Sequence, residues 1–244
     1  MKRTFGSDPK IIPSVRSAIF IVLLPLLVFV AERVTGRSFS TYGLLPRDIT
    51  GLRGIVFMPF LHADWSHLLS NMSALWILCA LGFYTFGRLF WGVLGFVWIA
   101  SGTWTWFFAR PDYHIGASGV VYGVAVFCLL SGFLNKNRSL QGLTLLTLFL
   151  YGSFLWGVFP WEFTRDISWE GHLAGALAGL IMALVFRRQM AEPPVYSWDV
   201  EPEPEVVPEE DMYWIEPRPR PETEMEPEPG PEPEKPSESE DLPS

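Results

Sequence analysis

The sequence predicts an all-α integral membrane protein with six membrane-spanning helices and a disordered acidic tail. The first 190 residues contain repeated long apolar runs rich in Leu, Phe, Trp and Gly, a pattern typical of helices that cross a bilayer. Charge divides the chain at the same point. Residues 1–190 carry 15 Lys and Arg against 8 Asp and Glu, whereas residues 191–244 carry 3 against 18. The net charge of −8 therefore belongs to the tail.

The N-terminal part begins with a polar segment, residues 1–14, which we expect to be cytoplasmic, and continues into the membrane domain, residues 15–190. The first apolar run covers residues 17–31 and contains Pro25, which a helix inside a bundle tolerates. A basic start before an apolar run also fits a signal peptide. We reject that alternative because Glu32 and Arg33 follow, no small-residue cleavage pattern is evident, and further spans come after.

The long loop at residues 38–66 is only half polar, since apolar side chains alternate with Arg47, Asp48 and Arg53. Such a loop is too apolar to be a free linker. We expect it either to pack on the bundle or to lie in the membrane interface, where short amphipathic helices are stable.

Five further spans are predicted at residues 67–84, 89–108, 118–134, 140–159 and 172–186. The connections near Arg88, Lys136 and Arg187 are short and basic. The positive-inside rule therefore puts both termini in the cytoplasm. We expect a multi-pass protein of the plasma membrane, with the lipid bilayer as its surroundings.

Two of the predicted spans are shorter than the roughly 20 residues that a full crossing needs. A short span can begin below the membrane surface when neighbouring protein shields the loop before it. Its first residue then lies at the floor of a water-filled cavity. Ser118 and His172 are these first residues.

The tail, residues 191–244, is rich in Glu and Pro, and this composition predicts a disordered, extended segment. Two aromatic groups interrupt it, at residues 196–198 and 212–215. They are either docking motifs for a cytoplasmic partner or stray aromatics in an inert solvating tail.

Ser118 is the candidate nucleophile, and Gly116 and Gly119 flank it. The alternative is structural, because serine is a common N-cap and glycine is frequent in membrane helices.

Spans two, four and six run in the same direction in an up-and-down bundle, so their first residues can meet at one level. Small residues at four-residue spacing let helix backbones approach closely in lipid. Two such series, Gly119 with Gly123 and Gly171 with Gly175 and Gly179, would hold Ser118 beside His172.

The general needs of acyl transfer suggest a role for each polar residue at these helix starts. His172 would be the base that activates Ser118. The oxyanion donors would be the Ser118 backbone N–H, the Asn71 amide and the His67 side chain. Tyr122 either stacks on the His172 ring or is an interfacial tyrosine.

No carboxylate is predicted inside a span, and Asp166 and Glu170 are expected in a loop, which favours a Ser–His dyad over a triad. His114 is interpreted as a loop histidine. No metal site is expected, because His62 and His67 are five residues apart and no His-Glu-x-x-His motif occurs. The two cysteines, Cys79 and Cys128, fall inside apolar runs and are expected to be buried rather than disulfide-bonded.

Three motifs in this order resemble the rhomboid family of intramembrane serine proteases: His62-x4-His67-x3-Asn71, Gly116-x-Ser118-Gly119 and Gly171-His172-Leu173-Ala174-Gly175. The resemblance covers about residues 15–190. It implies cleavage of peptide bonds in or next to transmembrane segments by a Ser118–His172 dyad, with oxyanion donors from His67 and Asn71 and with His62 near them. It also implies a lid at residues 160–170 and a first loop that rests partly in the membrane. It implies nothing about the acidic tail.

Two other classes of function compete with the protease. The first is a catalytically inactive rhomboid-like protein that binds membrane clients, although such relatives typically lack the serine or the histidine. The second is a channel or transporter, which the near absence of charged residues inside the spans and the lack of an inverted repeat oppose. We expect transmembrane-protein substrates, no cofactor and no nucleic-acid partner.

Overall fold

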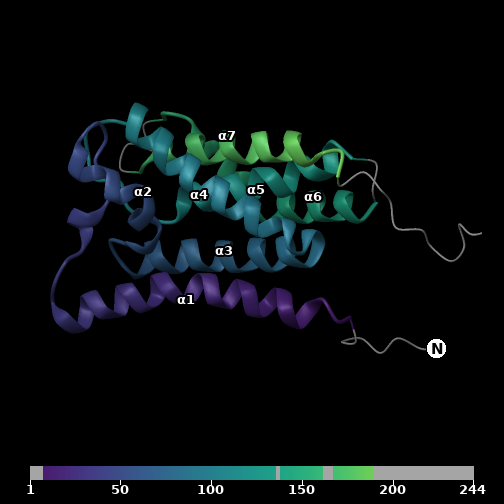
Figure 1. Cartoon of the computed structure of the whole chain (residues 1–244), viewed down its shortest axis with the longest axis horizontal. Coiled ribbons are helices and arrows are strands. Elements are labelled where there is room, and N and C mark those ends of the chain that lie inside the picture. Colours follow the sequence, from purple (N-terminus) through teal and green to yellow (C-terminus); the bar gives the residue numbers. More distant parts are fainter. Residues whose placement is uncertain (1–7, 136–137, 162–166, 190–244) are drawn as a thin grey trace, which may run out of the picture. The chain divides into compact units, whose positions relative to one another are not determined.

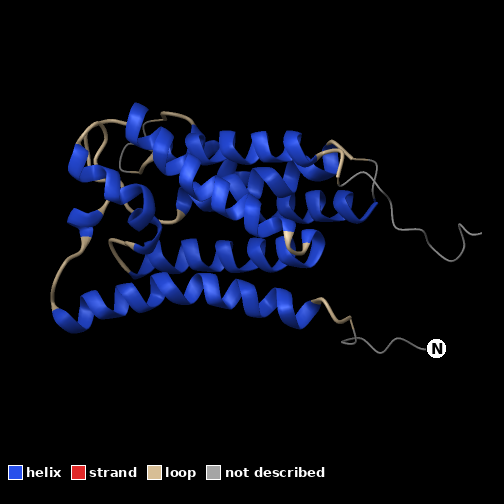
Figure 2. Ribbon diagram, in the orientation of Figure 1, coloured by secondary structure: helices blue, strands red, loops and turns tan. Residues whose placement is uncertain are grey.

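The computed structural model describes residues 8–135, 138–161 and 167–189. Within these residues every regular element is a helix, and a single isolated bridge joins Leu44 and His114. The six long helices lie alongside one another as a bundle (Figures 1 and 2). They are α1 (Ile11–Thr35), α3 (Trp65–Phe86), α4 (Leu89–Phe108), α5 (Ser118–Phe133), α6 (Arg138–Tyr151) and α7 (Trp169–Phe186).

Each long helix overlaps one predicted span. Three of them, α1, α3 and α7, are long and apolar enough to cross a membrane. Shorter apolar helices cover residues 118–133 and 140–151. The fold is therefore the predicted all-α membrane bundle, while the count of six crossings stays a prediction. Cys79 and Cys128 are buried and free.

The first predicted span, residues 17–31, is too short, because α1 covers Ile11–Thr35. Two predicted boundaries near α7 are also wrong. The span expected over residues 140–159 ends as an α-helix at Tyr151 and continues as a 3₁₀ segment, η4 (Gly152–Val158). Glycine is a poor α-helix former, and two glycines fall in η4. The last helix begins at Trp169 rather than at His172 because the Ser168 side chain caps it, accepting a hydrogen bond from the Gly171 amide at 3.2 Å. Glu170 thus lies in the first turn of α7 and not in a loop.

The long first loop packs on the bundle, which was one of its two expected placements. It forms four short helical elements: η1 (Ser40–Tyr42), η2 (Ile49–Arg53), α2 (Gly54–Phe57) and η3 (Met58–Phe60). The Trp106 indole of α4 donates to the Asp48 carbonyl at 2.9 Å, and the Arg47 guanidinium donates to the Ala109 carbonyl at 2.8 Å. These bonds hold the loop against the end of α4.

The contact between α5 and α7 is made by backbone. A Cβ atom added to Gly175 would overlap the Gly119 carbonyl oxygen, and one added to Gly179 would overlap the Gly123 carbonyl oxygen. In the other direction, a Cβ on Gly123 would lie 2.7 Å from the Gly175 oxygen. We call Gly119, Gly123, Gly175 and Gly179 the glycine seam. Because its helices touch at their backbones, it brings the first turns of α5 and α7 close together.

Side chains fill the core at the other end of α3. Phe90 of α4 packs edge-on against Phe83 of α3 at 4.9 Å between ring centroids, and Phe127 of α5 packs edge-on against Phe86 at 4.9 Å. We call Phe83, Phe86, Phe90 and Phe127 the aromatic cluster. Phe83 lies roughly four helical turns from His67 along α3, so this cluster stabilises the bundle away from the starts of α3, α5 and α7.

Candidate functional site

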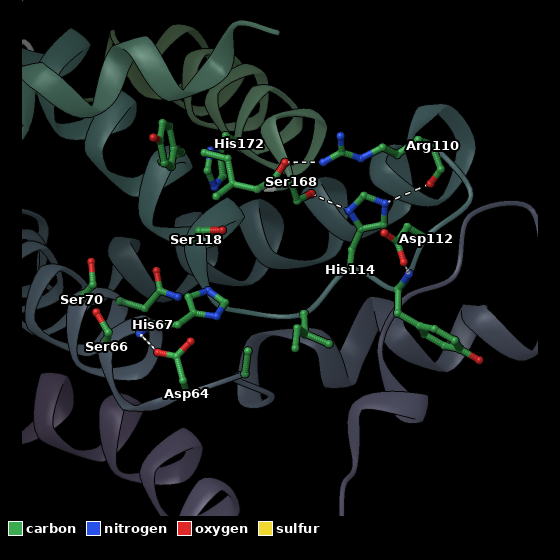
Figure 3. A pocket seen from close by; sticks show the side chains of 16 residues that line it. Asp64, Ser66, His67, Ser70, Arg110, Asp112, His114, Ser118, Ser168 and His172 are labelled. Atoms are coloured by element: carbon green, nitrogen blue, oxygen red, sulfur yellow. Dashed lines mark hydrogen bonds between the residues drawn. The ribbon is translucent and has the colours of Figure 1, made fainter. Parts of the chain in front are cut away.

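A cavity of about 570 Å³ opens where α3, α5 and α7 begin. Figure 3 shows its lining, with Ser118 between His172 and His67. Five of the predicted site residues line it together: His67, Asn71, Ser118, Tyr122 and His172. They come from three helices that are far apart in the sequence and that start at the same end of the bundle.

His172 is held from two sides. Its Nδ1 atom lies 2.9 Å from the Gly157 carbonyl oxygen in η4. A carbonyl can only accept a hydrogen bond, so Nδ1 carries the proton and Nε2 keeps a free lone pair. The Tyr122 ring stacks on the imidazole at 4.1 Å between centroids and 8° between planes. The histidine is buried, and its tautomer and ring plane are both fixed.

Gly157 cannot carry a side chain at this place. A Cβ atom there would overlap the Tyr122 hydroxyl and would lie 3.3 Å from Nδ1 of His172. The close approach of the η4 backbone is what lets its carbonyl reach the imidazole. A backbone carbonyl therefore occupies the position behind His172 that a carboxylate would take in a triad.

Ser118 is the first residue of α5, and its side chain faces the same cavity as His172 (Figure 3). Among the hydrogen bonds of the described residues, none joins these two side chains. Hydrogen bonds between catalytic groups often tighten only when a substrate is bound. What the fold provides is a hydroxyl and a free imidazole nitrogen that share one cavity.

The opposite wall comes from the first turns of α3. The Asp64 carboxylate caps this helix by accepting from the His67 amide at 2.9 Å, which sets where His67 and Asn71 lie. Gly116 passes close to both with φ at +111°. A Cβ atom on Gly116 would lie 2.6 Å from Nε2 of His67 and 3.4 Å from Nδ2 of Asn71.

The Asn71 amide is an unused donor at this wall. Its Nδ2 atom is buried and has no hydrogen-bond partner within the described part of the chain. A buried amide without a partner is costly, and such groups are commonly kept for a function. Asn71 can therefore donate to an oxygen atom that enters the cavity.

His62 lies next to this wall but does not line the cavity. Its ring packs edge-on against the His67 ring at 5.0 Å. It borders a second cavity of about 260 Å³ together with Arg33 and Arg37. Burial lowers the pKa of His62 to about 4. His62 is therefore near the expected oxyanion donors only in the sense that its ring packs against the His67 ring.

Sequence reasoning missed His114, which it had set aside as a loop histidine. The side chain is buried and lines the cavity. Its Nδ1 lies 2.6 Å from the Ser168 hydroxyl and its Nε2 lies 3.1 Å from the Arg110 carbonyl oxygen (Figure 3). Burial lowers the pKa of His114 from its ordinary value. The sequence did offer one clue: His114 is only four residues before Ser118, so its side chain could lie at the same cavity.

One ion pair borders the cavity, between Arg110 and Glu170 at 3.5 Å. Glu170 is the carboxylate that belongs to α7, but Nδ1–H of His172 donates to the Gly157 carbonyl oxygen. Asp166 lies outside the described residues, as do residues 162–166 of the expected lid and the whole acidic tail at 191–244.

The chain matches the family model described as "Rhomboid domain" over residues 50–189. It is 35% identical over 176 residues to an uncharacterised protein of Mycobacterium tuberculosis, covering 67% of this chain and 71% of that protein. An uncharacterised protein of Mycobacterium leprae is 37% identical over 175 residues, which is 67% of each chain. A protein of Acanthamoeba polyphaga mimivirus whose given name contains the word rhomboid is 32% identical over 132 residues, covering 52% of this chain and 71% of its own. With this match over more than half of its length, the chain belongs to the rhomboid family.

Proposed function

We propose that this protein is an intramembrane serine endopeptidase that hydrolyses peptide bonds in or next to transmembrane segments of other membrane proteins. The observation that carries the proposal is the free Nε2 atom of His172. The Gly157 carbonyl holds the proton on Nδ1, so the imidazole can act as a base toward the cavity that Ser118 shares. The rhomboid family consists largely of such proteases but also includes inactive members.

The reaction would proceed as acyl transfer. The Ser118 oxygen attacks the carbonyl carbon of the scissile bond while Nε2 of His172 takes the hydroxyl proton. The imidazolium that forms is stabilised by the Nδ1–H bond to Gly157. When the tetrahedral intermediate collapses, the C–N bond breaks and the same Nε2 proton passes to the leaving amine. Water then attacks the acyl carbon while Nε2 of His172 takes a proton from it. When this second intermediate collapses, the bond between the acyl carbon and the Ser118 oxygen breaks, and His172 returns the proton to that oxygen, which releases the carboxylic acid and restores the Ser118 hydroxyl.

The charge on the tetrahedral oxygen needs donors that are already in place. Asn71 supplies a buried amide with no partner among the described residues. His67 stands beside Gly116 at the same wall, and the Ser118 backbone N–H lies at the start of α5. These three groups form the proposed oxyanion site, and His62 would act only by supporting the His67 ring.

The proposed setting is a plasma membrane with both termini in the cytoplasm. The cavity lies where α3, α5 and α7 begin, and the described basic residues Arg88, Arg138 and Arg187 lie next to the other ends of these helices. The positive-inside rule then directs the cavity away from the cytoplasm. Its polar lining, which includes Asp64, Ser66 and Asp112, fits water entry from that side.

One observation favours a second function, an inactive relative that binds membrane clients. Ser118 and His172 are not hydrogen-bonded to each other in the part of the chain that the structure describes. If this separation persisted with a substrate bound, the pair could not transfer a proton. Activity measurements separate the two functions.

The test is cleavage of a model transmembrane substrate by purified protein, together with labelling by a serine-reactive fluorophosphonate. We expect Ser118→Ala and His172→Ala each to abolish both signals, and the double variant to be no worse than either single one because the two groups act as a unit. Ser73→Ala is the matched control, since Ser73 is exposed on α3 and its hydroxyl donates to the Ser70 carbonyl one turn away. Absence of cleavage and labelling in the unchanged protein would favour the client-binding function.

A further inference from the structure

A hydrogen-bonded group outside the proposed catalytic residues ties the loop before α5 to the start of α7. Ser168 is its centre, because its hydroxyl contacts both the Gly171 amide at 3.2 Å and Nδ1 of His114 at 2.6 Å. Arg110 adds an ion pair to Glu170 at 3.5 Å and a guanidinium bond to the Ile167 carbonyl. Figure 3 shows His114 between Ser168 and Arg110 at the edge of the cavity.

The directions of these bonds follow from what each atom can do. The Arg110 carbonyl can only accept, so Nε2 of His114 carries the proton and Nδ1 accepts. The Ser168 hydroxyl then donates to Nδ1 and accepts from the Gly171 amide. One consistent chain runs from Gly171 through Ser168 and His114 to Arg110, and it requires a neutral His114. Burial lowers the pKa of His114, which agrees with this protonation state at neutral pH.

The two middle members of this chain, His114 and Ser168, are each close in sequence to one residue of the proposed dyad. His114 precedes Ser118 by four residues, and Ser168 precedes His172 by four. The link at the second end is direct, because the His172 amide donates to the Ser168 carbonyl at 3.1 Å. A displacement of Ser168 would therefore move the first turn of α7 and the imidazole with it.

The glycine seam cannot fix this position alone. Glycines repeat every four residues on both helices, so the seam sets how closely α5 and α7 approach. It offers similar contacts to an α7 that is turned or shifted slightly along the ladder. The bond between His114 and Ser168 does not repeat along the helix in this way. The loop before α5 offers one histidine and the segment before α7 offers one serine, so the bond can form at only one position of α7.

We propose that His114 is a positioning residue, which through its hydrogen bond to Ser168 sets the first turn of α7 and so holds Nε2 of His172 toward Ser118. This inference rests on the proposed protease function. The two ring nitrogens of His114 are bonded to Ser168 and Arg110 rather than to Ser118 or His172. Loss of His114 should therefore lower kcat and leave KM nearly unchanged.

The test uses the full-length protein in detergent and measures kcat, KM and the rate of fluorophosphonate labelling. We expect His114→Ala to lower kcat and the labelling rate together by about 10- to 100-fold, since a misplacement near 1 Å can cost about 10²-fold. His114→Asn should keep most of the kcat and labelling rate that His114→Ala loses, because the Asn side-chain oxygen can accept from Ser168. Ser168→Ala should resemble His114→Ala, whereas Ser168→Thr keeps the hydroxyl and should retain activity.

Ser73→Ala is again the control, since it removes an exposed hydroxyl on α3 that donates to the Ser70 carbonyl. Unchanged kcat in folded His114→Ala, or a change in KM alone, would overturn the inference. If His114→Ala does not fold, the comparison between Ser168→Ala and Ser168→Thr decides: equal kcat in the two would overturn it. Loss of labelling in Ser168→Ala with normal labelling in His114→Ala would also overturn it, because Ser168 would then be the reacting serine. A wild-type protein that neither cleaves nor labels would instead contradict the proposed function.

Discussion

The glycine seam and the aromatic cluster pack the same bundle in opposite ways. In the seam, the α5 and α7 backbones touch and no side chain separates them. In the cluster, four phenylalanine rings fill the space between α3, α4 and α5. Rings can shift by rotating about their side-chain bonds, whereas a backbone contact can relax only by moving a whole helix. The seam therefore fixes the distance between α5 and α7 more strictly than the cluster fixes the distances between its helices.

The first prediction breaks the seam and has the largest expected effect. Gly175→Ala would put a methyl group onto the Gly119 carbonyl, so α5 and α7 must separate. We expect loss of detectable cleavage and a marked fall in Tm. Gly92→Ala on α4 is the matched control, because nothing lies within 4 Å of its added methyl and alanine is the better helix former by about 1 kcal/mol. If the Gly175→Ala variant kept its activity and a normal Tm, the seam would not require direct backbone contact between α5 and α7.

A second prediction removes one group that the helix starts bring together. Asn71→Ala deletes the buried amide that has no partner in the described residues. We expect kcat to fall by about 10²–10³-fold, the usual cost of one oxyanion donor, with a smaller change in KM. Steady-state kinetics on a model substrate checks this. An unchanged kcat would remove Asn71 from the proposed mechanism.

A third prediction disturbs the aromatic cluster and separates stability from activity. Phe90 is fully buried, and a Phe→Ala change in a core typically costs about 3–5 kcal/mol. We expect Phe90→Ala to lower Tm clearly while kcat per folded molecule stays within about twofold at temperatures well below the new Tm. Thermal unfolding and kinetics on the same sample measure both. A fall in kcat as large as that of Asn71→Ala would mean that the cluster also positions the site.

The smallest effect is expected from the tail, which belongs to neither region. Residues 191–244 carry a balance of −15 and would be repelled by anionic lipid on the cytoplasmic leaflet. We predict that truncation after Gln189 leaves kcat of the purified protein nearly unchanged, and that any effect appears only in cells. A several-fold change in kcat at equal folded fraction would instead indicate that the tail acts on the site through α7.

The sequence by itself determined the helical membrane fold and five of the residues that meet where α3, α5 and α7 begin: His67, Asn71, Ser118, Tyr122 and His172. Long apolar runs are set by local composition, and small residues at four-residue spacing mark the seam. The spacing of His67 and Asn71 likewise follows from helical periodicity. Each of these inferences uses only residues that are close together in the sequence, and none depends on which distant segments pack against each other.

Only the tertiary structure decided how these residues are held. The proton on Nδ1 of His172 depends on the Gly157 carbonyl, and the role inferred for His114 depends on Ser168. Tertiary packing also put His62 behind His67 rather than in the cavity. The two hydrogen bonds join residues 15 and 54 positions apart, and local periodicity carries no information about such pairs. Hydrogen bonds also require placement to within a few tenths of an ångström, which the packing of whole helices sets.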